Sequence, residues 1–329
     1  MKIVQAPLRI TLGGGGTDLP SWYREHGGFL VTAAIDKFIY MTGSRRIYDN
    51  KIWLSYSKVE VCDSIQEIKH ELFKSVLGQF KFPVGYEIHS VSNLPGNSGL
   101  GSSGAFLVAL IKLMSEVTSR SFSAQEIAEL ACHIEMVDLG RSSGKQDPYA
   151  SAFGGIHALE ITRSGEVTVS PLKLTNQVVK DLTTQMHIYS TGTTRDSESV
   201  LKNQNIDIAG RKGSAVAAMR RIQEIGYKSR DCLESGDLDT FGHLLHEHWI
   251  EKKLISDKMS APNIDALYSY ALENGGLGGK IIGAGGGGYL LVYVPRGNED
   301  GFQSAMKRIG SREMEWQFWS QGASVIYSL

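Results

Sequence analysis

The stretch Asn93-Leu-Pro-Gly-Asn-Ser-Gly-Leu-Gly-Ser-Ser-Gly-Ala-Phe106 decides the fold, because it joins a predicted strand to a predicted helix through a turn rich in glycine and serine. Residues 84–91 before it have strand character, and the apolar side chains after it recur with helical spacing as far as Val117. Glycines let the backbone turn tightly and approach a ligand, and the free N–H groups at the start of a helix attract an anion. The order strand, glycine turn, helix therefore predicts a phosphate-binding loop.

Two common phosphate-binding patterns do not fit this loop. Residues 99–104 satisfy G-x-G-x-x-G, but a dinucleotide-binding fold needs an acidic residue about 20 positions later, where residues 121–123 read Ser-Phe-Ser. No Lys-Ser or Lys-Thr pair follows the glycines, so the loop is not a Walker loop. A structural loop without a ligand stays open as an alternative. If the loop does bind phosphate, Ser102 and Ser103 offer hydroxyls for phosphate oxygens or for magnesium.

Composition limits the classes of function. The chain has 329 residues, enough for two domains, of which 42% are hydrophobic and 21% are charged. The net charge of -1 gives no broad basic surface for nucleic acid or for an anionic membrane. The N-terminus lacks an apolar signal segment, and no apolar run reaches the roughly 18 residues of a membrane span, so we expect a cytoplasmic protein. Cys62, Cys132 and Cys232 are too few and too far apart for a disulfide framework.

A second glycine cluster, Gly13-Gly-Gly-Gly-Thr-Asp18, follows a predicted strand over residues 3–11. Four consecutive glycines cost chain entropy, which close approach of the backbone to a ligand would explain. Asp18 offers a carboxylate to sugar hydroxyls, and Arg9 on the strand offers a fixed cation. In the alternative interpretation Asp18 caps a helix that begins at Leu19-Pro20, and Arg9 is a solvated strand residue.

The next predicted helix begins with a capping box, Ser123-Ala-Gln-Glu126, and ends at Gly140. Glu135 lies beside the apolar stripe of this helix. A carboxylate near a packed face is costly without a partner. Glu135 is therefore either a residue at the border of the stripe or a ligand for a cation.

After this helix the chain reads Arg141-Ser-Ser-Gly-Lys-Gln-Asp-Pro148. The proline makes Asp147 a plausible helix N-cap. In the alternative interpretation Asp147 is a general base, held ionised by Arg141 and Lys145.

The second half of the sequence carries two further polar turns. A predicted strand over residues 186–190 runs into Thr191-Gly-Thr-Thr-Arg195, just after an expected domain boundary near residue 183. A third glycine cluster, Gly283-Ala-Gly-Gly-Gly-Gly288, is followed by a strand-like segment, whereas a dinucleotide fingerprint needs a helix there. We expect this cluster to let the backbone approach the active site or the first domain.

Three glycine motifs in this order, with an acid after Ser143-Gly-Lys-Gln, resemble the GHMP kinases. Ala6 to Asp18 resembles the first motif, Pro95 to Ala105 the phosphate loop, and Gly283 to Gly288 the third motif. The resemblance implies a two-domain α/β (α+β) kinase. Its N-terminal ATP-binding domain, residues 1–182, would hold the phosphate loop in a left-handed βαβ unit like that of ribosomal protein S5 domain 2, and residues 183–329 would form a ferredoxin-like C-terminal domain.

The resemblance also implies the roles of single residues. Asp147 matches the catalytic base and Arg9 the basic residue beside it, while Ser103 and Glu135 match the magnesium ligands. The implied ATP-binding residues are Pro95, Gly96, Gly99, Gly101, Ser102, Ser103 and Gly104. The expected substrate-binding residues are Gly15, Gly16, Thr17, Asp18, Arg141, Lys145, Arg195, Gly285 and Gly286, with Arg195 as the leading candidate for a substrate phosphate.

Within the family, the motifs that end at Asp18 and Asp147 are most similar to the sugar-1-kinase branch, which includes heptose 7-phosphate kinases and L-fucokinases. Pro148 departs from this branch, which commonly has a second Gln there. The resemblance implies an ATP- and Mg²⁺-dependent sugar-1-kinase, and the short chain favours the heptose enzyme within that branch, which phosphorylates the C1 hydroxyl of D-glycero-D-manno-heptose 7-phosphate for nucleotide-activated heptose synthesis. An L-fucokinase or a galactokinase is the alternative, and a non-catalytic sensor of sugar and ATP is the alternative of another class. The implied partners are ATP and a sugar phosphate, without nucleic acid or membrane, and a homodimer stays open.

Overall fold

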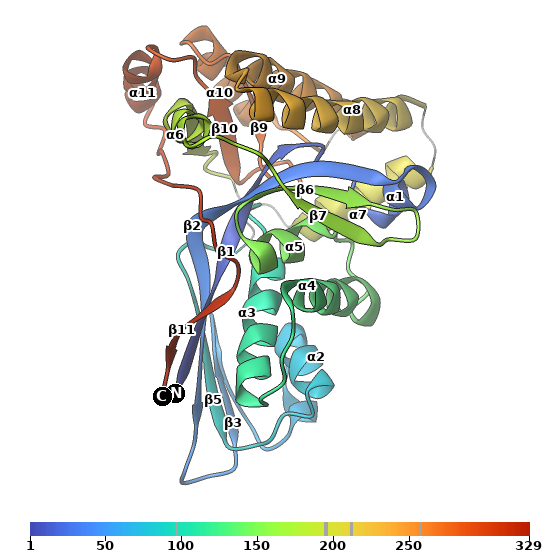
Figure 1. Ribbon diagram of the computed structural model, residues 1–329, viewed down its shortest axis with the longest axis vertical. Coiled ribbons are helices and arrows are strands. Elements are labelled where there is room, and N and C mark those ends of the chain that lie inside the picture. Colours follow the sequence, from blue (N-terminus) through green and yellow to red (C-terminus); the bar gives the residue numbers. More distant parts are fainter. Residues whose placement is uncertain (97, 194–196, 211–212, 257) are drawn as a thin grey trace.

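The computed structural model describes residues 1–329 except 97, 194–196, 211–212 and 257. The chain forms a mixed α/β fold with one long sheet and one short sheet (Figure 1). The long sheet contains β1 (Lys2–Gly13), β2 (Gly28–Arg45), β3 (Ile52–Ser55), β4 (Val59–Cys62), β5 (Tyr86–Ser92), β6 (Ile156–Ile161), β7 (Val167–Pro171) and β11 (Ser324–Ser328).

The centre of the long sheet is the antiparallel pair β1 and β2, in the order β11-β1-β2-β5-β3-β4, with β6 and β7 joined to the first half of β2. Strands β3 and β5 are parallel, and the chain between them forms β4, a 3₁₀ turn and a helix. Helices cover one face of the sheet, with α3 and α5 against β1 and β2 (Figure 1). This part of the chain contains α1 (Pro20–His26), the 3₁₀ turn Ile65–Glu67, α2 (Glu71–Gln79), α3 (Ser102–Val117), α4 (Ala124–His133), the π-helical turn Ile134–Asp138 and α5 (Gln146–Phe153).

The short sheet is antiparallel, in the order β8-β10-β9. Residues 312–314 run along the free edge of β8, where Ser190 N donates to Arg312 O at 3.0 Å and Met314 N to Ile188 O at 2.8 Å. This order confirms the expected ferredoxin-like arrangement. The elements are α6 (Asn176–Gln185), β8 (Met186–Ser190), α7 (Ser197–Ala209), α8 (Gly213–Ser235), α9 (Leu238–Ile255), α10 (Pro262–Glu273), β9 (Gly278–Ile281), β10 (Tyr289–Tyr293) and α11 (Glu299–Arg308).

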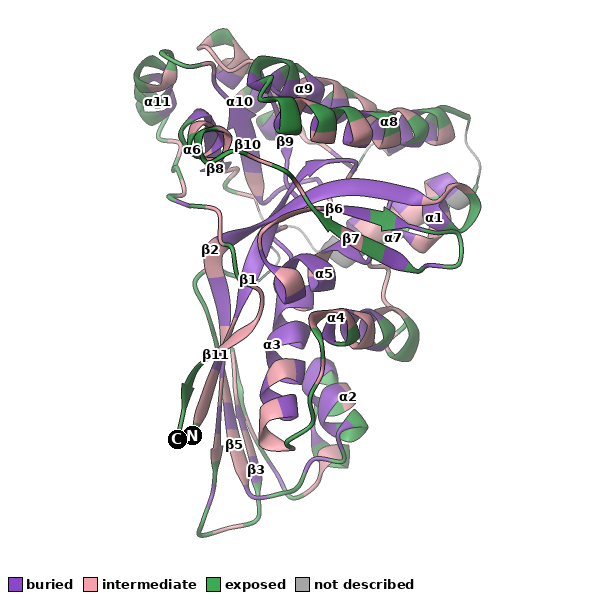
Figure 2. Cartoon of the chain, in the orientation of Figure 1, coloured by how far each residue is buried: buried purple, intermediate pink, exposed green. Residues whose placement is uncertain are grey.

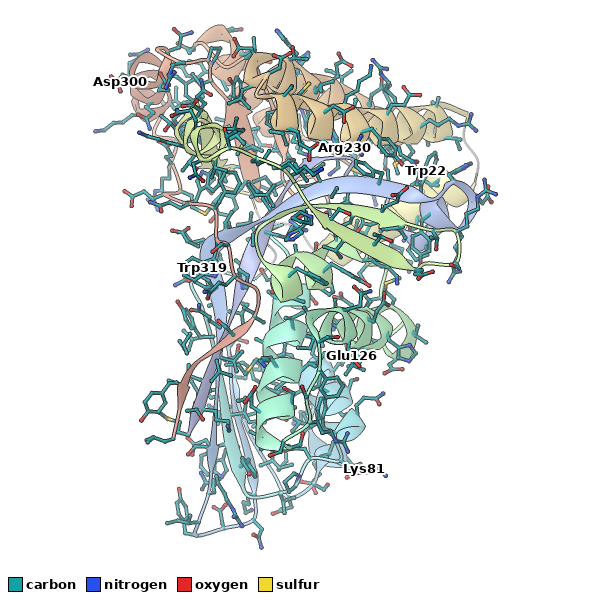
Figure 3. All side chains as sticks on the ribbon, in the orientation of Figure 1. Trp22, Lys81, Glu126, Arg230, Asp300 and Trp319 are labelled. Carbon is teal, nitrogen blue, oxygen red and sulfur yellow. The ribbon has the colours of Figure 1, made fainter. Side chains whose placement is uncertain are left out.

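The two halves of the chain meet over β1 and β2, where α8 packs against both strands. Phe29 of β2 stacks on Tyr227 of α8 with ring centroids 3.8 Å apart, and Arg230 lies over Phe29 (Figure 3). From Ala6 to Gly13 every residue of β1 is buried (Figure 2). A strand covered on both faces can hold a charged side chain inside the protein only if that side chain has a partner.

The end of the chain returns to the long sheet. Strand β11 pairs with β1, and Trp319 packs edge-on against Phe38 of β2 with centroids 5.0 Å apart (Figure 3). The proposed boundary between residues 182 and 183 lies inside α6, just before β8. Among the described residues, the helices are too short or too polar to cross a membrane.

Candidate active site

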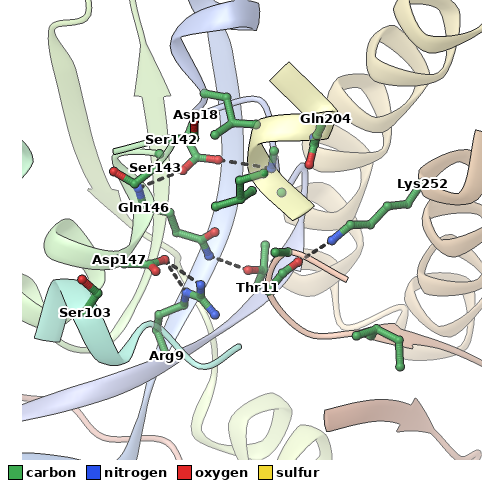
Figure 4. A pocket seen from close by; sticks show the side chains of 18 of the residues that line it. Arg9, Thr11, Asp18, Ser103, Ser142, Ser143, Gln146, Asp147, Gln204 and Lys252 are labelled. Atoms are coloured by element: carbon green, nitrogen blue, oxygen red, sulfur yellow. Dashed lines mark hydrogen bonds and ion pairs between the residues drawn. The ribbon is translucent and has the colours of Figure 1, made fainter. Parts of the chain in front are cut away.

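A cavity of 360 Å³ opens where the N-terminal half of the chain faces α9 and β9 (Figure 4). Its N-terminal wall comes from β1, the first glycine cluster, the start of α3 and the segment that leads into α5. Its opposite wall comes from α7, α9, β9 and the start of the third glycine cluster. Segments far apart in the sequence therefore meet at one hollow.

The start of α3 lies beside this cavity and leaves its first backbone amides without an acceptor among the described residues. Gly101, the N-cap, has a left-handed backbone with φ 81°, and its helix end has no side-chain cap. Within the described part of the chain, no protein group accepts a hydrogen bond from the amides of Ser102, Ser103 or Gly104. Leu100 O accepts from Arg9 N at 3.0 Å, which ties the loop to β1. Free amides at a helix N-terminus are suited to phosphate oxygens.

Arg9 and Asp147 form an ion pair at the same end of the cavity (Figure 4). Arg9 Nη2 lies 2.6 Å and Arg9 Nε 2.7 Å from Asp147 Oδ1, and Arg9 Nη1 donates to Gly99 O at 2.5 Å. Arg9 is 5% exposed, so the interpretation of a solvated strand residue is wrong. Helix α5 begins at Gln146 with Lys145 as its N-cap, so Asp147 is not the cap and its carboxylate is available to a ligand.

Glu135 reaches the cavity from the π-helical turn. It is buried, and Ser103 Oγ donates to Glu135 Oε1 at 2.5 Å. Burial raises the pKa of Glu135, while the hydrogen bond from Ser103 opposes that rise. The side chain therefore lies inside the protein, and the interpretation of a border residue is wrong.

Asp18 lies at the other end of the same wall and is buried. Gln146 N donates to Asp18 Oδ2 at 3.0 Å and Gly16 N to Asp18 Oδ1 at 3.2 Å (Figure 4). Burial raises the pKa of Asp18, and the bond from Gln146 lowers it. The N-cap of α1 is Leu19, so the capping interpretation of Asp18 is wrong.

Two of the expected substrate-binding side chains turn away from the cavity. Lys145 Nζ donates to Gly165 O at 2.5 Å and lies 3.1 Å from Glu129 Oε2. Thr17 is buried, and its hydroxyl donates to Gly14 O at 2.8 Å. The structure therefore brings neither the Lys145 amine nor the Thr17 hydroxyl to the cavity.

The other expected residues are distributed as follows. Arg141 lines the cavity and lies 2.9 Å from Glu71. Gly15 and Gly16 line the cavity too, whereas Gly286 does not, and its N–H donates to Met259 O at 2.7 Å. Besides Thr17, Lys145 and Gly286, the expected residues that the cavity lining does not include are Pro95, Gly96, Gly99, Gly101, Ser102, Gly104 and Gly285. Arg195 lies outside the described residues.

The opposite wall holds basic residues that are not among the site residues expected from the sequence. Lys252 and His248 of α9 and Lys280 of β9 all line the cavity and are buried. His248 and Lys252 are four positions apart, which places both on the apolar stripe of α9, and Lys280 lies in an otherwise apolar strand. The sequence did contain a signal for this wall. A basic residue at a position that helix or strand periodicity assigns to the core indicates a buried polar site.

Comparisons with known proteins agree with this arrangement. The profile of the GHMP kinases N terminal domain matches residues 63–155, and that of the GHMP kinases C terminal domain matches residues 229–312. The D-glycero-alpha-D-manno-heptose 7-phosphate kinase of Campylobacter jejuni is 30% identical, over 97% of this chain and 96% of that protein. The crystal structure of a D-glycero-D-manno-heptose 1-phosphate kinase from Bacteroides thetaiotaomicron has 26% identity, covers 100% of both chains and gives a TM-score of 0.82.

A more distant structure has the same fold. The Lactococcus lactis galactokinase complexed with galactose covers 98% of this chain and 94% of its own, with 19% identity and a TM-score of 0.75. Two family profiles, a nearly full-length relative and the observed fold agree with one another. The chain belongs to the GHMP kinases.

Proposed function

We propose that this chain transfers the γ-phosphoryl group of ATP to the anomeric C1 hydroxyl of D-glycero-D-manno-heptose 7-phosphate. The observation that carries the proposal is the Arg9–Asp147 pair, because it holds a carboxylate beside the start of α3, where a Cβ added at Gly101 would meet Asp147 at 3.3 Å. The heptose kinase of C. jejuni, similar over nearly its whole length, supports the choice of sugar. Asp18, with Gly15 and Gly16, lies in the same cavity and suits the hydroxyls of that sugar.

In the proposed reaction, Asp147 accepts the proton of the C1 hydroxyl while the C1 oxygen attacks the γ-phosphorus. A bond forms between that oxygen and phosphorus, the bond to the β–γ bridging oxygen breaks, and ADP leaves. Arg9 holds the Asp147 carboxylate in place through their ion pair and adds positive charge near the reacting groups. Phosphoryl transfer depends mainly on positioning and on neutralising spread negative charge. The amides of Ser102, Ser103 and Gly104 supply part of that neutralisation.

The residues at the start of α3 suit Mg²⁺ bound together with ATP. Magnesium prefers oxygen ligands and is usually held by one or two carboxylates plus substrate phosphates. Glu135 supplies a buried carboxylate, and Ser103 supplies a hydroxyl 2.5 Å from it. When bound, the ion would neutralise charge on the phosphates. Ser103 and Glu135 would hold it, and they would position the phosphates over Asp147.

Replacing Glu135 with Gln is expected to raise the Mg²⁺ concentration needed for half-maximal rate by at least about 10-fold, as loss of a metal-orienting group does. The amide keeps the size of the side chain and can still accept from Ser103, but it lacks the charge that attracts the cation. Titrating Mg²⁺ at saturating ATP and sugar measures the effect. An unchanged Mg²⁺ dependence would remove Glu135 from the metal site.

A coupled assay for ADP against a panel of sugars tests the proposed substrate. We expect kcat/KM for heptose 7-phosphate to exceed that for free heptose, mannose, L-fucose and galactose by at least about 100-fold, as expected for a site that pairs with a charged group. Phosphorus NMR would locate the new phosphate on C1. Turnover of L-fucose or galactose with none of heptose 7-phosphate would assign another sugar-1-kinase activity. Sugar binding without ADP formation would identify a sensor.

A further inference from the structure

The wall of the cavity opposite Asp147 is built from buried basic side chains. Lys252 is 6% exposed, Lys280 2% and His248 1%, and all three line the cavity. Lys252 enters from α9, on the side away from Asp147 (Figure 4). Buried lysines are rare unless they are paired. A negatively charged ligand would therefore stabilise this wall.

The protein supplies little of that charge. Lys252 Nζ donates to the carbonyl of Gly283, which is neutral. In the described part of the chain no group accepts a hydrogen bond from the Lys280 amine, and neither ring nitrogen of His248 has a partner. Burial lowers the pKa of Lys252 to about 8, with repulsion from Arg9 adding to the effect and Asp18 opposing it. Burial, then repulsion from Lys252 and Arg9, lowers the pKa of Lys280.

The anion that fits this wall is not the transferred phosphoryl group. Ser103 and Glu135 are hydrogen-bonded to each other at the start of α3, on the N-terminal wall, whereas Lys252 and Lys280 belong to the opposite wall. In Figure 4, Arg9 lies between Ser103 and Lys252, and Asp18 lines the same cavity. A sugar whose C1 hydroxyl faces Asp147 and whose other hydroxyls face Asp18 directs its far end at α9.

We propose that Lys252 and Lys280, with His248 beside them, bind the phosphate group that the sugar substrate already carries. The inference rests on the proposed function and adds the residues that make the enzyme select a sugar phosphate. Lys145 is not available for this role because its amine bonds to Glu129 and Gly165. Arg141 is less suited because it lies near Glu135, whose pKa it lowers, and pairs with Glu71.

Replacing Lys252 with Met tests the site, because Met keeps most of the volume and removes the charge. KM for heptose 7-phosphate is expected to rise about 10- to 100-fold, the scale of a lost charge-assisted hydrogen bond. KM for ATP and kcat/KM for unphosphorylated heptose should stay within about 3-fold of wild type, since neither substrate places a phosphate there. Lys280→Met should give the same pattern.

Lys253→Met is the matched control. Lys253 follows Lys252 on α9, but its amine lies 3.3 Å from Asp265, outside the cavity, and we expect wild-type kinetics. If Lys252→Met lowered kcat/KM equally for phosphorylated and free heptose, or if it raised only the KM for ATP, the proposal would be overturned. If wild type does not use heptose 7-phosphate, the proposed function fails first. If wild type uses it and the variants keep its KM, this inference alone fails.

The pH dependence of the wild-type enzyme gives a test that needs no variant. The groups facing Lys252 are Arg9, Asp18, Lys280 and His248. Lys252 carries its proton below a pKa of about 8 and loses it above. KM for heptose 7-phosphate should therefore rise as the pH increases through 8, while KM for free heptose should not. The same pH profile for both sugars would contradict the site.

Discussion

Replacing Asp147 with Asn is expected to lower kcat by about 10²- to 10⁴-fold, the contribution typical of a general base. The Asn side chain has the same size and can still accept a hydrogen bond from Arg9, whose Nε lies 2.7 Å from Asp147 Oδ1. It cannot accept the proton of the C1 hydroxyl. Because the amides of α3 and the Ser103–Glu135 pair are untouched, the dissociation constant for ATP should stay near that of wild type. Steady-state kinetics and calorimetry measure the two effects.

Asp49→Asn is a matched control for the loss of an ion pair. Arg46 and Asp49 are 2.7 Å apart with side chains 5% and 28% exposed, against 2.6 Å, 6% and 29% for Arg9 and Asp147. The two pairs are thus alike in distance and burial, but Asp49 does not line the cavity. We expect wild-type kcat for Asp49→Asn. Wild-type turnover in Asp147→Asn, or an equal drop in both variants, would reject Asp147 as the base.

Local sequence was enough to predict the separate elements that form the N-terminal wall of the cavity. The order strand, glycine turn, helix appears as β5, the loop and α3, because glycine content and apolar spacing are properties of neighbouring residues. Asp18 and Asp147 could be proposed because each follows a distinctive turn. Their meeting in one cavity could be inferred only from the family resemblance, since it depends on long-range strand pairing.

Three features depended on packing that the sequence does not show. The π-helical turn at Ile134–Asp138 changes the helical period, so spacing at 3.6 residues per turn put Glu135 beside the stripe rather than inside. Lys145 lies two residues before Asp147, but its amine donates to Glu129 and to the Gly165 carbonyl, away from the cavity. Lys252 and Lys280 face the cavity only because α9, with β9 packed against it, docks on β1.

Replacing Gly104 with Ala is expected to lower kcat by about 100-fold, the cost of a displacement of the reacting groups of about 1 Å. Gly104 lies in the first turn of α3, where Ala would ordinarily stabilise the helix. Here an added Cβ would meet Asp147 Cβ at 2.6 Å, Pro148 N at 2.8 Å and Asp147 C at 2.9 Å. These atoms belong to the backbone and Cβ of α5, so no rotamer change relieves the contact. Helix α5 must shift, and Asp147 must move with it.

Gly78→Ala separates this steric effect from the effect of alanine on a helix. Gly78 lies in α2, and a Cβ added there has no atom within 4 Å. We expect Gly78→Ala to keep wild-type kcat and to raise the free energy of unfolding by about 0.5–1 kcal/mol. Gly104→Ala should instead lower it by about 1–3 kcal/mol, as overpacking does. Thermal melts and ADP assays measure both. If Gly104→Ala matched Gly78→Ala in stability and turnover, the close packing of α3 on α5 would not be what holds Asp147 at the reacting oxygen.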